Sequence, residues 1–266
     1  NWWAQSHHHL LGFTPFGRAA ASVAVTTYEQ LVELARKGLL PDVVVTWRTA
    51  SVALDRGTIE RALVAAELLE RQSINVTEAW ANDTFMACTT VLWWLTASEH
   101  HQDILPLEPQ TVIQAVSTGT FKFLVRPQNR RSNHYPIAKD PGQYGRWLLP
   151  VNTGNNHWWL LVVDTRTRIM TVYDSLEVRR TRGHNKVIKV ITSYFTAVTD
   201  QVAWDVQFVE DVPRQGDTKS CGYYVVEFGR RLCSGRSVGG SPVLVSEVVQ
   251  AVMTMMLGFN VRKFGA

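Results

Sequence analysis

The chain has few cysteines, only a small excess of positive charge and no long apolar run, and each shortage argues against a class of protein. Three cysteines among 266 residues do not suit a disulfide framework; they suit a reducing compartment, nuclear or cytoplasmic. The 27 Lys and Arg exceed the 23 Asp and Glu by four charges, too few and too scattered for nucleic-acid binding. No run approaches the roughly 18 apolar residues of a transmembrane helix, so we expect no membrane association.

Spacings typical of metal sites and visible targeting signals are missing as well. Neither CxxC nor HExxH occurs, so we expect no metal and no cofactor. Basic residues cluster at residues 126–131, 166–168 and 179–186. Solvated loops explain such clusters, and a docking face for an acidic protein partner is the alternative. The chain begins with Asn1 instead of Met, and we expect a piece of a longer protein.

Two stretches near the N-terminus have the apolar spacing of amphipathic helices. The first covers residues 27–40 and ends before Pro41. The second runs from about Thr58 to Arg71, with Asp55 or Thr58 as the candidate cap. We therefore assign residues 1–75 to an N-terminal helical extension of unknown role and residues 76–266 to the main domain.

The main domain begins with a helix within residues 79–100. Asn82 or Asp83 can cap this helix, and Cys88 falls on its apolar side, so we expect that thiol in the core. Residues 126–146 are rich in Pro, Gly, Asn and Arg and predict a long loop, which in a compact domain is often functional.

From Trp147 onward the pattern is that of strands followed by helices. WLLPV, HWWLLVVD and IMTVYDSL predict strands, the last two joined by a tight turn, and HWWLLVVD is apolar on both faces and hence central. Residues 186–202 predict a helix and residues 207–212 a further strand. Helices are also expected from Cys221 to Arg231 and after Ser246. Strands flanked by helices, with the helices partly segregated from the strands along the sequence, indicate an α+β fold.

Cys221 follows the polar loop RQGDTKS and begins an apolar helix. A buried structural thiol is one interpretation. The other is a nucleophile, because the positive end of a helix dipole favours a thiolate and Gly222 lets the backbone approach a substrate.

A catalytic thiol also needs a base, a group that orients the base and a donor for the oxyanion. His157 opens one strand, and Asp174 lies 17 residues later near the open end of the partner strand, so the carboxylate can reach the imidazole. Gln215 precedes Cys221 by six residues, and its amide can bind an oxyanion together with the Cys221 N–H. Each residue alone is weak evidence, but the ordered set is a catalytic candidate.

The ordered set and its flanking residues resemble the Ulp/SENP-like cysteine proteases, which process SUMO and related ubiquitin-like proteins. The matching pieces are WANDTF (residues 80–85), HWWLLVVD with VYDSL (residues 157–176) and VPRQGDTKSCGYYVV (residues 212–226). The resemblance implies a papain-like protease fold of the ubiquitin-like protease type, with residues 76–266 as its catalytic domain. It implies that His157 is the general base, Asp174 its orienting partner, Gln215 the oxyanion donor and Cys221 the nucleophile.

The same resemblance implies substrate-binding residues. Trp80 and Trp158 would form a narrow aromatic passage over the diglycine tail of the substrate. Asp83 would either contact that tail or cap its helix, and we prefer the helix cap. Two positions depart from the family pattern: Ser220 stands where an aspartate is usual, and Ala81 where a leucine is usual. Residues 1–75 have no counterpart in it.

Three functions remain open at this point. The first is a peptidase or isopeptidase that cleaves after the Gly-Gly of SUMO or a related protein, acting as a monomer on that protein and its conjugates. The second is an acetyltransferase that forms an acyl-cysteine, and the third is a silent homologue that binds a ubiquitin-like protein without cleaving it. The complete catalytic set argues against the third, and the tryptophan pair argues against the second.

Overall fold

The computed structural model describes residues 27–39, 43–47, 50–54, 56–67, 80–119, 144–199 and 203–264. Contacts divide the chain into two compact units: a first unit of residues 1–88, 128–135 and 244–266, and a second unit of residues 89–127 and 136–243. This division follows the contacts within the chain and does not test whether residues 1–75 fold separately from the rest. The assignment of residues 1–75 as an extension separate from a domain of residues 76–266 therefore stays a prediction.

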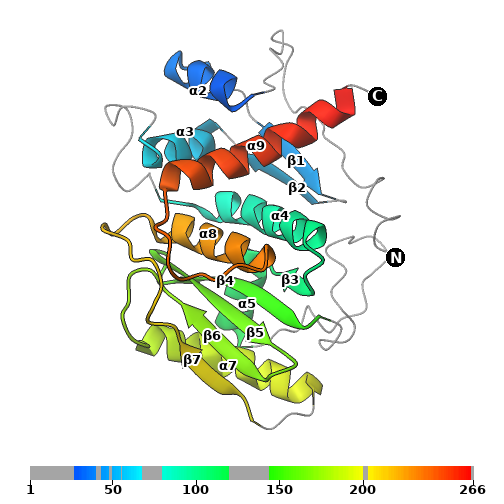
Figure 1. Ribbon diagram of the computed structural model, residues 1–266, viewed down its shortest axis with the longest axis vertical. Coiled ribbons are helices and arrows are strands. Elements are labelled where there is room, and N and C mark those ends of the chain that lie inside the picture. Colours follow the sequence, from blue (N-terminus) through cyan, green and yellow to red (C-terminus); the bar gives the residue numbers. More distant parts are fainter. Residues whose placement is uncertain are drawn as a thin grey trace. The chain divides into compact units, whose positions relative to one another are not determined.

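The second unit contains a five-stranded sheet in the order β3-β4-β5-β6-β7 (Figure 1). Its strands are β3 (Ile104–Pro106), β4 (Arg146–Thr153), β5 (His157–Asp164), β6 (Ile169–Tyr173) and β7 (Asp205–Phe208). The three inner strands pair antiparallel, and each edge strand pairs parallel to its neighbour. The predicted α+β fold with a mixed central sheet is confirmed.

The middle strand β5 is buried on both faces between Trp158 and Val163, as its uninterrupted apolar sequence predicted. Its antiparallel hairpin with β6 runs from the pair Leu160↔Tyr173 at the open end to the pair Asp164↔Ile169 beside the turn. The predicted strand at residues 207–212 is displaced, since β7 ends at Phe208. The Val209 N–H still donates to the Val172 carbonyl of β6, but the Glu210 carbonyl accepts a hydrogen bond from the Arg214 side chain instead of from a strand.

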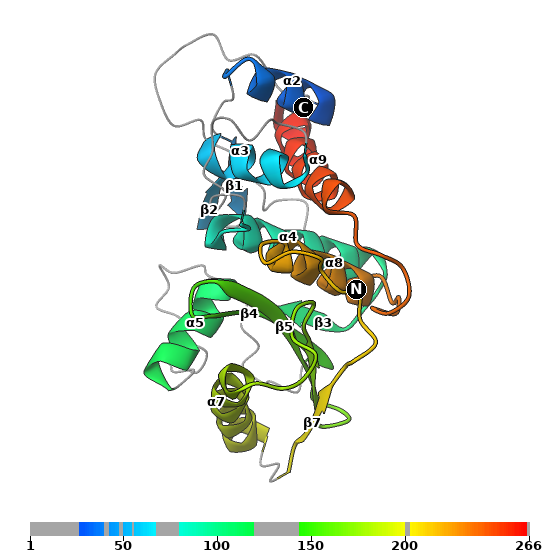
Figure 2. The ribbon, with the colours of Figure 1, turned by 90° about the vertical axis from the view of Figure 1, so that its left-hand side faces the viewer.

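Helices cover both faces of this sheet. Helices α5 (Pro109–Thr118) and α7 (Arg182–Thr199) lie on one side, and α8 (Cys221–Cys233) packs against β5 from the other (Figure 2). The helix α7 begins four residues earlier than the apolar stripe alone predicted. A polar cap at Thr181 accounts for the earlier start, because Thr181 accepts a hydrogen bond from the third residue of the helix.

The helix α4 (Asp83–Glu99) has Asn82 as its cap, because the Asn82 side chain accepts the Phe85 N–H at 2.9 Å. Asp83 is the first helical residue, so our preference for Asp83 as the cap is wrong. Cys88 is buried, as predicted. Helix α4 is buried on more than one side over much of its length, so its apolar pattern defines no single stripe.

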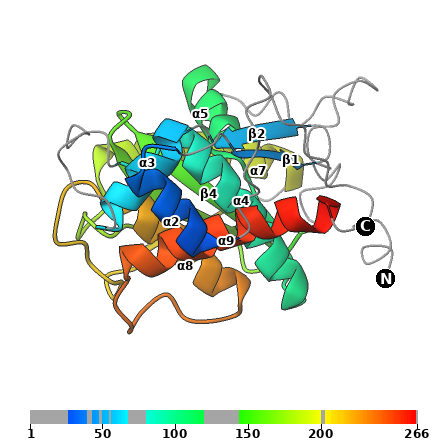
Figure 3. The same cartoon turned by 90° about the horizontal axis from the view of Figure 1, so that it is seen from above.

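The first unit contains helices α2 (Tyr28–Arg36), α3 (Arg56–Ala65) and α9 (Val245–Phe264), with both α2 and α3 in contact with α9 (Figure 3). Thr27 and Gln30 form a reciprocal capping box at the start of α2. The helical interpretation of residues 27–71 was incomplete, because an antiparallel hairpin of β1 (Val43–Trp47) and β2 (Ala50–Leu54) lies between the two helices. Their β-branched residues favour strands.

The predicted loop at residues 126–146 lies outside the described residues up to residue 143. Among the helices that the structure describes, none is both long and apolar enough to span a bilayer.

Candidate active site

The thiol of Cys221 lies at the first residue of α8, where the helix packs against β5. The side chain is buried, and the backbone N–H of Trp158 donates to its Sγ at 3.4 Å. As the first residue of a helix, Cys221 has an N–H without an intrahelical acceptor, and the positive end of the dipole favours negative charge there. The structure thus places the Cys221 sulfur and the Cys221 N–H at the positive end of the α8 dipole.

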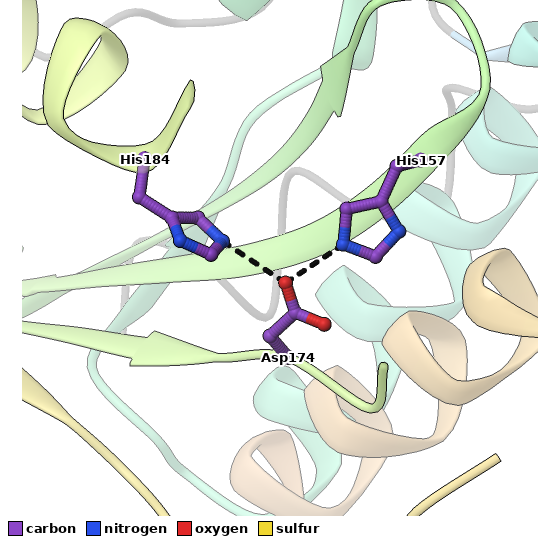
Figure 4. Close-up of side chains that lie close together, drawn as sticks. All are labelled: His157, Asp174 and His184. Carbon is purple, nitrogen blue, oxygen red and sulfur yellow. Dashed lines mark hydrogen bonds and ion pairs between the residues drawn. The ribbon is translucent and has the colours of Figure 1, made fainter. Parts of the chain in front are cut away.

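His157 and Asp174 meet at the open end of the β5–β6 hairpin. The Nε2 atom of His157 lies 2.7 Å from Oδ2 of Asp174, and the carboxylate is completely buried (Figure 4). Asp174 directly follows β6, and the register places it diagonally across from His157 on the same face of the hairpin. The expectation that the carboxylate reaches the imidazole agrees with this geometry.

A second imidazole shares the same carboxylate oxygen. Nε2 of His184, near the start of α7, lies 2.9 Å from Asp174 Oδ2 (Figure 4). The other oxygen, Oδ1, accepts the backbone N–H groups of Leu176 and Glu177 at 2.8 and 2.9 Å. No sequence motif indicated His184 as a residue of this site. The spacing of Thr181 and His184 could have indicated it, since this is the spacing of a capping box.

These contacts shift the pKa values of His157 and Asp174 in opposite directions. Burial alone would raise the pKa of Asp174, but the hydrogen bonds from His157 and His184 hold it well below its usual range. Burial also opposes protonation of His157. Hydrogen bonding and charge from Asp174 and Cys221 outweigh it and raise the pKa of His157 to about 10. The site therefore favours an imidazolium beside an ionised carboxylate.

Gln215 is buried in the loop before α8, and its side chain is held at both ends. Its Oε1 accepts the Ser175 hydroxyl at 2.6 Å, and its Nε2 donates to the Asp217 carbonyl at 2.6 Å. Because a carbonyl only accepts, the amide orientation is fixed, and the second N–H of Nε2 is available for another acceptor. This arrangement suits an oxyanion donor.

Arg214 connects the same loop to the end of the hairpin. Its guanidinium donates to the carbonyl oxygens of Asp174 at 2.9 Å, Glu177 at 2.5 Å and Glu210 at 2.8 Å. The Gln215 N–H donates to the Ser175 carbonyl at 3.1 Å. The segment that carries the carboxylate and the segment that carries the amide are therefore one hydrogen-bonded unit, which sequence motifs did not indicate.

The Ser220 hydroxyl donates to Oδ2 of Asp217 at 2.7 Å, and Oδ1 of Asp217 accepts the Ser220 N–H at 2.7 Å. Burial would raise the pKa of Asp217, but hydrogen bonds from Ser220 and Lys219 lower it. A carboxylate thus stands close to the start of α8 although Ser220 itself carries none.

The three predicted substrate-binding residues are placed differently. Trp158 belongs to the second unit and is buried beside the thiol. Trp80 and Asp83 belong to the first unit; Trp80 is half-buried, and burial raises the pKa of Asp83. Their pairing with Trp158 over a substrate tail therefore stays a prediction.

His157, Asp174 and His184 have the atom types of a metal site and lie close enough together for one. The backbone N–H of Thr181 donates to Nδ1 of His184 at 2.9 Å, so Nδ1 accepts and the proton sits on Nε2. A protonated Nε2 has no lone pair for a cation. The cluster is therefore arranged for hydrogen bonding.

Comparisons with known proteins agree with this site. Residues 147–257 match the model of the Ulp1 protease family, C-terminal catalytic domain. A sentrin-specific protease of Caenorhabditis elegans is 29% identical over 90 residues, which cover 31% of this chain and 12% of that protein. The chain thus spans about an eighth of that relative.

Solved structures share the fold. The C-terminal Ulp1 protease domain, solved in complex with Smt3, the yeast ortholog of SUMO, superposes with a TM-score of 0.64 at 13% identity, over 91% of this chain and all of that chain. The Ulp1-like SUMO protease catalytic domain of Chaetomium thermophilum gives 0.53 at 16% identity, over 93% of this chain and 90% of that chain. The predicted protease fold is confirmed, and residues 147–257 of this chain match the model of the Ulp1 protease catalytic domain.

Proposed function

We propose that the chain is a cysteine peptidase or isopeptidase that cleaves after the C-terminal Gly-Gly of SUMO or a related ubiquitin-like protein. The observation that carries this proposal is the 2.7 Å contact of His157 with the buried Asp174, together with a thiol at the start of α8. The Ulp1 family match supports the reaction class, and the solved relative in complex with Smt3 supports the class of substrate.

In the first half-reaction, His157 takes the thiol proton and the Cys221 thiolate attacks the carbonyl carbon of the terminal glycine. The carbonyl electrons move to oxygen. The Cys221 N–H and the second N–H of Gln215 Nε2 stabilise this oxyanion. His157 then gives its proton to the leaving amine, the C–N bond breaks, and a thioester to Cys221 remains.

Water completes the cycle. His157 removes a proton from water, the hydroxide adds to the thioester carbon, and the C–S bond breaks as the oxyanion collapses. The released sulfur recovers the proton from His157 and the acid product leaves. Asp174 stays ionised throughout and stabilises the imidazolium, which agrees with its lowered pKa.

Trp80 and Trp158 are the proposed selectivity residues. A narrow aromatic passage admits glycine, which has no side chain, and excludes larger residues.

The partner is then the ubiquitin-like protein or its conjugates, and the enzyme acts as a monomer. We place this activity in the nucleus or cytoplasm, since Cys88, Cys221 and Cys233 are all unpaired and a free thiol nucleophile needs reducing surroundings.

The test uses SUMO and ubiquitin whose C-terminal glycine carries an electrophile. We expect a covalent adduct on Cys221 with at least one probe and none with Cys221→Ala. Cys233→Ala is the matched control, because that thiol is buried and burial raises its pKa. A folded chain that reacts with no such probe would refute the proposal, and acetylation of Cys221 by acetyl-CoA in that case would favour the transferase.

A further inference from the structure

We propose that His184 is a positioning residue of this site: it donates its Nε2–H to Asp174 Oδ2 and so holds the carboxylate that orients His157. The inference rests on the proposed function, because it assigns His184 a part in that reaction. His184 lies outside the set that the sequence motifs indicated.

The cap of α7 fixes which nitrogen of His184 carries the proton. The Thr181 backbone N–H donates to His184 Nδ1 at 2.9 Å, and the Thr181 hydroxyl lies 3.4 Å from the His184 N–H, which donates to it. This is the reciprocal arrangement of a capping box, with histidine at the position that Glu or Gln usually occupies. Since Nδ1 accepts, the proton is on Nε2, 2.9 Å from Asp174 Oδ2.

Aromatic packing fixes the orientation of the same ring. The Trp159 ring meets it edge-on, with centroids 4.5 Å apart and planes at 89°. Phe208 of β7 lies 5.8 Å away, between ring centroids. The side chain of His184 is 1% exposed. Both nitrogens and the ring plane are therefore held before any substrate binds, which is what a positioning residue requires.

Without His184 the carboxylate would lose one of four contacts. Leu176 and Glu177 hold Oδ1, while Oδ2 has the two imidazoles. Because Asp174 is completely buried, loss of the His184 donor leaves a charged oxygen less satisfied, and the carboxylate can turn away from His157. The proton transfer from Cys221 to His157 then loses its alignment.

Two substitutions separate positioning from a role in helix stability. Gln and Glu at the third helical position can both complete the reciprocal cap. Only His184→Gln can also donate to Asp174, whereas His184→Glu brings a second carboxylate. A third variant, His184→Ala, removes both contacts. Ile191→Ala is the stability control, because Ile191 is buried on the same helix and is not part of the triad.

We expect kcat to fall about tenfold or more in His184→Ala and His184→Glu with KM within about twofold, and to recover within about threefold in His184→Gln. Ile191→Ala should lower the melting temperature and leave kcat of the folded enzyme near wild type. Equal kcat values for the folded Gln and Glu variants, or wild-type kcat in folded His184→Ala, would overturn the inference.

A second readout needs no substrate. The rate of Cys221 alkylation by iodoacetamide at neutral pH reports thiolate paired with His157, and should drop severalfold in the Ala and Glu variants but not in Gln. If wild type cleaves no diglycine substrate, the proposed function fails while alkylation still judges His184. If wild type cleaves a diglycine substrate and Cys221 is alkylated at the wild-type rate in all three His184 variants and in Ile191→Ala, only the His184 inference fails.

Discussion

At the scale of single residues, the charge on Asp174 determines how the site responds to pH. The pKa of His157 is raised to about 10, so the imidazolium persists well above neutrality. We expect kcat/KM to decline on the alkaline side near pH 10. Asp174→Asn removes the charge that holds this proton and should move the decline to lower pH. Coincident alkaline limbs in the two pH profiles would contradict this assignment.

The same pair links folding to pH. The pKa of His157 is raised above its unfolded value near 6.5, so its stabilisation is complete below that pH and is lost as pH rises through about 10. The pKa of Asp174 is lowered, so its contribution is present above 3.8 and is lost on acidification. In urea unfolding, His157→Gln should therefore cost more stability at about pH 6 than at pH 10.5. A loss that is constant across this range would contradict the pairing.

Gln215 contributes through its amide alone in the proposed mechanism. Gln215→Ala should lower kcat about 100-fold to 1,000-fold with little change in KM, because the donor acts on the transition state. Ser175→Ala leaves the amide present but removes the hydroxyl bonded to its Oε1, and should cost less. Single-turnover kinetics on a fluorogenic diglycine substrate measure both, and equal losses would argue against a direct donor role.

At the scale of elements, the close approach of α8 to α4 depends on a glycine. A Cβ at Gly229 would lie 2.1 Å from Cε2 of the Trp93 ring, and the Trp93 indole also donates to the Val226 carbonyl at 2.9 Å. The Trp93 side chain is completely buried and has little room to move.

We therefore expect Gly229→Ala to destabilise the fold by about 2 kcal/mol or more, although alanine is the better helix former. Gly216→Ala is the matched control, since a Cβ there would meet no atom within 4 Å. Chemical denaturation measures both free energies of unfolding. A Gly229→Ala variant as stable as Gly216→Ala would mean that the indole relocates.

At the scale of the whole molecule, the assigned boundary after residue 75 can be tested. Helices α2 and α3 contact α9, and Leu31, Ile59 and Val252 are buried in this first unit. Deleting residues 1–75 removes α2, α3 and β1, all of which contact α9. The shortened chain should lose stability and bind hydrophobic dyes, whereas deletion of residues 1–26 removes none of the described helices. Equal urea midpoints for the two deletions would support an independent domain from residue 76.

Local sequence patterns determined the central hairpin of the sheet and the place of the candidate nucleophile. The uninterrupted apolar run of β5, the tight turn before β6 and the polar loop before Cys221 are short-range features, so they predicted the central hairpin and the thiol at a helix start. The approach of Asp174 to His157 followed from hairpin register. The β1–β2 hairpin was missed because its short strands lie between two strongly periodic helices.

Only the tertiary structure decided the contacts between residues that share no sequence pattern. Arg214 joins three carbonyl oxygens from two segments, and His184 reaches Asp174 from a helix on one face of the sheet. Hydrophobic periodicity specifies which face of an element is buried, but a hydrogen bond requires two distant backbones to be placed to within tenths of an ångström. The sequence by itself therefore determined the candidate nucleophile and base, while the folded chain decided how the carboxylate between two imidazoles is held.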